Sequence, residues 1–284
     1  MANGTIIVLC YQMMISSYYF RIIMKINREF LDNEQGVMLI ELLIVLMIIG
    51  LLITGAVKTW DITIQQTKFS QTVKEMDQLV YAIAGNQELM SEGKRSDFGY
   101  IGDMGKIPDT LLDLVRAPAN ATNWRGPYIK VNFAENADDY IKDAWSNSYI
   151  YKKDSLTITS YTSGSYETPQ TWIHRRVAQS ESLLLDNEVS GRVQDLTGKP
   201  PGVSYAYIRV FIIHPTNGIL ETLPPIGEMP NENGIYTITD VPEGNHKMFV
   251  IYVPSPTIAD TVEKYVCIYP GIVNTVDFRL TQEF

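Results

Sequence analysis

The first strongly patterned part of the chain is a run of apolar residues over 37–57, in which Leu, Ile and Met dominate and no proline occurs. An α-helix rises about 1.5 Å per residue, so a helix over this run is long enough to cross the ~30 Å hydrocarbon core of a bilayer. The run therefore predicts a membrane-spanning helix over residues 37–57.

Beyond Val57 the pattern becomes amphipathic. Apolar residues recur every seven positions at Ile62, Phe69, Met76 and Ile83, with polar and charged residues between them. This spacing is typical of one buried face of a helix, and no proline separates it from the preceding run. We expect the buried face to pack on a domain formed further along the chain.

The rest of the chain predicts two folded parts. Residues 58–180 continue from the helix into Gly- and Ser-rich loops, a short helix that begins near Pro108, and an alternating strand over 156–161. Residues 187–284 contain about seven short strands separated by turns, which is typical of a β-sandwich. The predicted fold class is α+β, with a long N-terminal membrane-spanning helix packed on a small β-sheet domain, followed by an all-β sandwich domain.

One carboxylate, Glu41, interrupts the apolar run. A charged group within a membrane helix costs a few kcal/mol, so such a group is a functional candidate. If the chain is cut after Gly36, a new amine on Val37 lies four residues before Glu41, and an amine and a carboxylate on neighbouring helices can neutralise each other. The alternative is that Glu41 lies at a helix end and reaches the lipid headgroups.

The block that begins at Gly36, Gly-Val-Met-Leu-Ile-Glu-Leu-Leu-Ile-Val, closely resembles the prepilin cleavage and methylation motif. The resemblance implies that a prepilin peptidase cuts between Gly36 and Val37 and that the new N-terminus of Val37 is methylated. It also implies that Glu41 sets the register of subunits in a filament. Most members of the family have phenylalanine where this chain has Val37.

By the same resemblance, residues 1–36 are a leader that is absent from the mature protein. Prepilin leaders are usually short and basic, and the segment from Met24 to Gly36 begins in that way. Residues 1–23 are semi-apolar, and we interpret them as an over-extended gene start with the true start at Met24. A second membrane helix is the alternative.

Two later segments, 124–128 and 143–151, resemble the major pseudopilin of type II secretion systems and imply a pseudopilin-like domain over 58–180. We interpret their aromatic residues as core and loop anchors, because aromatic side chains bury large areas. The calcium loop of that family uses several aspartates. The corresponding segment here begins at Thr162, ends at Pro169 and offers one carboxylate, so neither this calcium site nor another cofactor is expected.

The last hundred residues resemble the carboxypeptidase regulatory-like, or transthyretin-like, domain. The motifs that carry this resemblance are Val-x-Gly-x-Val from Val189 and Gly-x-Tyr-x-Ile from Gly234. The resemblance implies a structural or adhesive module over 187–284 without an active site.

Composition excludes some functions. The net charge of −9 and the pI near 4.9 argue against nucleic acid as a partner, because a basic face would be expected. The three histidines share no metal-ligand spacing, and no Ser/His/Asp arrangement occurs. We therefore predict no catalytic residue, no metal and no enzymatic activity.

The sequence thus predicts a structural subunit of a type II secretion pseudopilus or a type IV pilus-like filament. Its expected partners are the prepilin peptidase, other pilin or pseudopilin subunits, the inner-membrane assembly platform and the membrane. The expected location is the inner membrane, crossed once, with the body in the periplasm and later in a periplasmic or cell-surface filament. The alternative is a minor pilin or adhesin whose β-sandwich binds a glycan or a protein.

Overall fold

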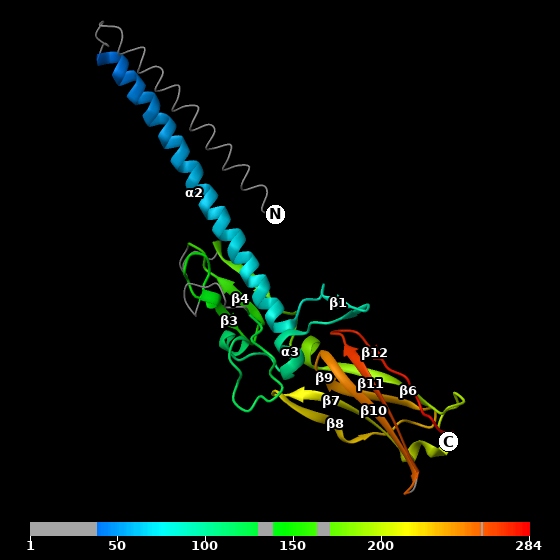
Figure 1. Ribbon diagram of the computed structural model, residues 1–284. Coiled ribbons are helices and arrows are strands. Elements are labelled where there is room, and N and C mark those ends of the chain that lie inside the picture. The colour runs from blue at the N-terminus through cyan, green and yellow to red at the C-terminus, as the bar shows by residue number, and fades with distance from the viewer. Residues whose placement is uncertain (1–38, 130–138, 164–170, 257) are drawn as a thin grey trace. The chain divides into compact units, whose positions relative to one another are not determined.

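The computed structural model describes residues 39–129, 139–163, 171–256 and 258–284 (Figure 1). Within these ranges the chain forms thirteen strands and few helices. The chain divides into two compact units, one up to Gln65 and one over Gln66–Phe284. All of the described strands belong to the second unit.

Helix α2 (Leu39–Ala84) has 46 residues and contains no proline. It ends at Gly85, which adopts a left-handed conformation with φ of 76° and whose N–H donates to the Tyr81 carbonyl at 2.7 Å. A Cβ at position 85 would lie 2.3 Å from the Asp97 carbonyl oxygen. Glycine therefore ends the helix both because of its backbone conformation and because the next loop packs directly against it.

The predicted α+β fold, with a membrane-spanning helix packed on a small β-sheet domain, is wrong. Most of the described elements are strands, and none of the described helices is long and apolar enough to cross a membrane. The prediction of a transmembrane segment over 37–57 is therefore wrong. The predicted single-pass inner-membrane location depended on that segment and is wrong as well.

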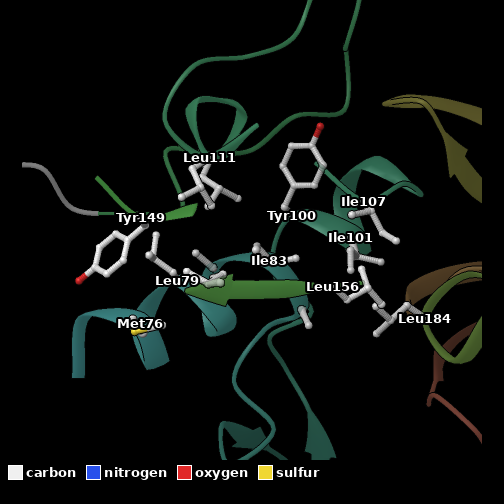
Figure 2. Packing of buried hydrophobic residues seen from close by; sticks show 14 of the residues in the cluster. Met76, Leu79, Ile83, Tyr100, Ile101, Ile107, Leu111, Tyr149, Leu156 and Leu184 are labelled. Atoms are coloured by element: carbon white, nitrogen blue, oxygen red, sulfur yellow. The ribbon is translucent and has the colours of Figure 1, made fainter. Parts of the chain in front are cut away.

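A first hydrophobic core forms on the C-terminal part of α2 (Figure 2). Met76 and Ile83, two positions of the seven-residue repeat, are fully buried, which confirms that part of the predicted helical face. An antiparallel sheet in the order β3-β4-β5 contributes Ile158 to this core. The elements that surround it are α3 (Gly99–Met104), η1 (Leu111–Leu114), η2 (Asp139–Ile141), β3 (Ile150–Lys152), β4 (Thr157–Ser160), β5 (Ile173–Arg176) and α4 (Ser182–Leu185).

The short helix predicted after Pro108 is present as the 3₁₀ turn η1. Thr110 and Asp113 form a capping box that satisfies the first backbone N–H groups of the turn. Leu111 and Leu114 are buried, whereas Leu112 is 43% exposed. The difference follows from the tighter winding of a 3₁₀ turn, in which residues three apart share a face.

The C-terminal part is β-sandwich-like, with two sheets around a second core (Figure 1). One antiparallel sheet has the order β11-β10-β7-β8, and in the other β6 pairs with β9, β12 and β13. The strands are β6 (Asn187–Gln194), β7 (Ile208–Thr216), β8 (Ile219–Glu228), β9 (Ile235–Val241), β10 (Gly244–Ser255), β11 (Ile258–Ile268), β12 (Asn274–Thr275) and β13 (Phe278–Arg279). The 3₁₀ helix η4 (Gly202–Tyr207) precedes β7, and the short strands β1 (Met90–Ser91) and β2 (Lys94–Arg95) lie before α3.

In β7 alternate residues face the core, and Ile208, Val210 and Ile212 are fully buried. Strand β8 was not predicted, because Pro224 and Pro225 interrupt its sequence. Proline cannot donate a ladder hydrogen bond, and β8 tolerates it because it is an edge strand of its sheet.

The turn between β7 and β8 packs on the first part of the same unit. The Gly218 N–H donates to the Met104 carbonyl at 2.8 Å, and the Asn123 N–H donates to the Gly218 carbonyl at 2.8 Å. A Cβ at Gly105 would lie 1.8 Å from the Pro215 carbonyl oxygen. The two cores are therefore joined by backbone contacts that leave no room for a side chain.

Candidate assembly surface

The N-terminal part of α2 presents a continuous set of exposed apolar side chains. Their exposed fractions range from 42% at Ile49 to 69% at Leu52, with only Gly50 between them. Monomeric soluble proteins rarely expose such a contiguous apolar surface, which usually marks an interaction site. We call this set the α2 apolar surface: Leu42, Leu43, Ile44, Val45, Leu46, Met47, Ile48, Ile49, Leu51, Leu52 and Ile53.

Glu41 lies in the first turn of α2, immediately before the α2 apolar surface, and is exposed. A carboxylate at this end of a helix interacts favourably with the unsatisfied N–H groups of the first turn. Gly36 and Val37, the predicted cleavage residues, lie outside the described residues. Of the three predicted site residues, the structure therefore places only Glu41.

The C-terminal part of α2 is held by side chains of the folded body. The Tyr149 hydroxyl donates to Glu75 Oε2 at 2.9 Å, and the Ala144 N–H donates to Thr72 Oγ1 at 3.1 Å. Arg175 Nε lies 2.6 Å from Asp77 Oδ1. These contacts fix the helix from Thr72 onward.

The aromatic residues of the two predicted motifs act as anchors in the structure. Trp124 Nε1 donates to the Asp113 carbonyl at 3.0 Å, and the Tyr128 hydroxyl donates to Asp103 Oδ2 at 2.9 Å. Burial raises the pKa of the Tyr149 hydroxyl well above its ordinary value of 10.0, with the Glu75 carboxylate adding to the effect. A buried, neutral tyrosine that donates one hydrogen bond is typical of a structural residue.

A buried ion pair that sequence reasoning missed joins the two cores. Arg95 Nη1 lies 3.0 Å from Glu243 Oε2, and the two side chains are only 3% and 1% exposed. Arg95 Nε also donates to the Asp97 carbonyl at 2.8 Å, and Nη2 donates to the Ala84 carbonyl at the end of α2. One side chain thus connects the last turn of α2, the loop after β2 and the turn between β9 and β10.

Glu243 is in an unfavourable place for a charge. Its Oε1 atom is buried and, among the described residues, has no hydrogen-bond partner. Burial raises the pKa of Glu243 to about 7, and the opposing attraction of Arg95 does not cancel this effect. The attraction between Arg95 and Glu243 therefore offsets only part of the free-energy cost of removing the two charges from water.

Two histidines lie in the same region. His246 Nε2 is 2.8 Å from the Pro242 carbonyl oxygen and His214 Nδ1 is 3.2 Å from that of Pro215. Burial lowers the pKa of His246 to about 4 and also lowers the pKa of His214. The lowered pKa values favour the neutral rings, and both side chains serve as buried packing groups.

The described ranges contain no group of three or more His, Cys, Asp or Glu side chains that could hold a metal ion. Of the segment from Thr162 to Pro169, only Thr162 and Ser163 are described. Thr162 Oγ1 donates to the Thr171 carbonyl at 3.1 Å, which makes it a loop residue of the body.

Comparison with known proteins finds no protein-family model that matches the chain and no curated protein that matches it. The resemblances to prepilins, pseudopilins and transthyretin-like domains rest on the sequence motifs.

Proposed function

We propose that this protein is a structural subunit of a filament of the type II secretion pseudopilus or type IV pilus kind. In this proposal a prepilin peptidase cuts after Gly36, the amine of Val37 is methylated, and subunits assemble through α2. The observation that carries the proposal is the α2 apolar surface with Glu41 directly before it. The partners are other pilin or pseudopilin subunits, the peptidase and the assembly platform.

Covering the α2 apolar surface would favour assembly, because apolar area is then removed from water. Burying an apolar side chain stabilises an assembly by roughly 1.5–3 kcal/mol for each residue of Leu or Ile size. Helices that share such a surface pack side by side and exclude water from the contact. A carboxylate in such a bundle needs a partner, and the amine created on Val37 of a neighbouring subunit supplies one.

Replacing Glu41 by Val tests this role. The folded body should be unaffected, because Glu41 is exposed and lies outside the compact unit Gln66–Phe284. The yield of filaments sheared from cells of the native host should fall at least about tenfold, because register depends on the carboxylate. Glu88→Val, which removes an exposed carboxylate from a loop after α2, is the matched control and should assemble normally.

Intact-mass analysis of the same filaments tests the maturation step. The expected N-terminus is Val37 carrying one methyl group. Wild-type yield from Glu41→Val, or filaments whose subunits still begin at Met1 or Met24, would contradict the proposal.

A further inference from the structure

A groove within the unit Gln66–Phe284 lies between its two parts. Its volume is about 450 Å³, which is in the range of small-ligand sites. One wall comes from α3 and from the loop that carries Arg125 and Tyr128. The other wall comes from β7, β10 and β11, with Ile213, Lys247 and Tyr265.

A carboxylate and a guanidinium lie side by side in the groove. Arg125 Nε is 3.7 Å from Asp103 Oδ1, and the Arg125 side chain is 73% exposed. The Tyr128 hydroxyl donates to Asp103 Oδ2 and so fixes the carboxylate. This pair offers acceptors next to donors, which is the arrangement that binds two adjacent hydroxyl groups.

An aromatic ring lines the other wall of the groove. Tyr265, on edge strand β11, is 78% exposed although it lines the groove. An exposed ring of this size presents a flat apolar face that packs against C–H groups of a ligand. The ring and the Asp103–Arg125 pair therefore suit a ligand with one apolar face and several hydroxyl groups.

The charged groups of the groove are already compensated. Lys247 Nζ lies 2.7 Å from Glu263 Oε1, and Arg125 lies beside Asp103. The two oxygens of Asp97 accept the backbone N–H groups of Asn86 and Gly99. A neutral ligand fits this balance better than an anion or a cation, because either ion would lack a counter-charge.

We propose that this groove binds a neutral saccharide. One sugar ring stacks on Tyr265 while adjacent hydroxyl groups pair with the Asp103 carboxylate and the Arg125 guanidinium. The site goes beyond the assembly role proposed above and does not depend on it, because none of its residues belongs to α2.

The test uses the full chain in a zwitterionic detergent, which contains no sugar headgroup that could compete. The protein is applied to an array of neutral oligosaccharides (glucans, mannans, galactans and N-acetylhexosamine oligomers) and of acidic ones. Binding to at least one neutral class is expected. Tyr265→Ala should weaken it at least about tenfold, and Asp103→Asn should weaken it as well.

Tyr207→Ala is the matched control, because Tyr207 is a 53% exposed tyrosine on η4 that does not line the groove. This variant should bind as the wild type does, and circular dichroism should show that all three variants remain folded. The proposal is overturned if no saccharide binds, if only acidic saccharides bind, or if Tyr265→Ala binds normally. Filament yield is measured with different variants, so failure here is distinguishable from failure of the assembly role.

Discussion

At the scale of single residues, the Arg95–Glu243 pair is the least expected feature of the molecule. A glutamate in the turn Pro-Glu-Gly reads as an exposed loop residue, and its partner lies 148 positions earlier in the chain. The spacing of residues along a sequence predicts contacts between residues a few positions apart on a helix or strand. It could not predict a contact between Arg95 and Glu243. Buried ion pairs are also weak stabilisers, because both charges lose their water.

The Glu243 carboxyl should make stability depend on pH. Its pKa in the folded protein, about 7, is above the ordinary value of 4.5, so its stabilising contribution is complete below pH 4.5 and is lost as pH rises to about 7. Relative to wild type, Glu243→Gln should therefore gain about 3 kcal/mol of unfolding free energy across this window. Urea unfolding of both proteins from pH 4 to pH 8 measures the difference.

His246 contributes a pH dependence of stability of the opposite sign in both proteins. This contribution cancels when the unfolding free energy of wild type is subtracted from that of the variant. Glu88→Gln, which removes an exposed carboxylate, is the control and should show a much smaller change. If wild type instead gains stability over Glu243→Gln as pH rises, attraction to Arg95 outweighs burial and the assigned direction is wrong.

At the scale of elements, the sequence predicted the buried faces whose apolar residues recur at regular spacing. The buried face of α2 at Met76 and Ile83 and the inward face of β7 both follow from spacing alone. Strand β8 was not predicted because Pro224 and Pro225 interrupt its sequence, and of the predicted site residues Gly36, Val37 and Glu41 only Glu41 lies among the described residues. The groove at Tyr265 could not be predicted, since its walls come from segments far apart in sequence.

The contact between α3 and the β7–β8 hairpin gives an element-scale prediction. Gly105 and Gly93 both have positive φ, 62° and 77°, but only at Gly105 would a Cβ meet another atom within 4 Å. Gly93→Ala should cost about 1 kcal/mol of stability for the backbone conformation alone. Gly105→Ala should cost at least about 2 kcal/mol more, because Pro215 must move.

Thermal or urea unfolding of the two variants measures this difference. Since the two substitutions are chemically identical, equal losses of stability would show that the hairpin does not pack tightly on α3.

At the scale of the whole molecule, the described part of the unit Gln66–Phe284 contains two hydrophobic cores with no shared residue. The buried members of the first end at Leu184, and those of the second begin at Val189. The domain boundary expected between residues 180 and 187 stays a prediction, because residues 66–284 form one compact unit. Each core can therefore form from its own segment, with the contacts at Gly218 and Glu243 added on docking.

A fragment of residues 182–284 should accordingly be soluble, rich in β-structure and nearly free of helix by circular dichroism. It should unfold cooperatively, at a lower temperature than the full chain, because the docking contacts are gone. A fragment ending at residue 185 should still fold around Met76 and Ile83. An unfolded 182–284 fragment would show that the two cores depend on each other.

The three hydrogen-bonding partners of the Arg95 side chain have a mechanical consequence. Tension that reaches the last turn of α2 at Ala84 has two routes onward, the covalent chain through residues 85–94 and the guanidinium of Arg95. The second route leads directly to Glu243 and so into the β-sandwich. A pull along α2 would therefore be shared between the covalent loop and the Arg95 guanidinium, and part of the load would reach the β-sandwich directly.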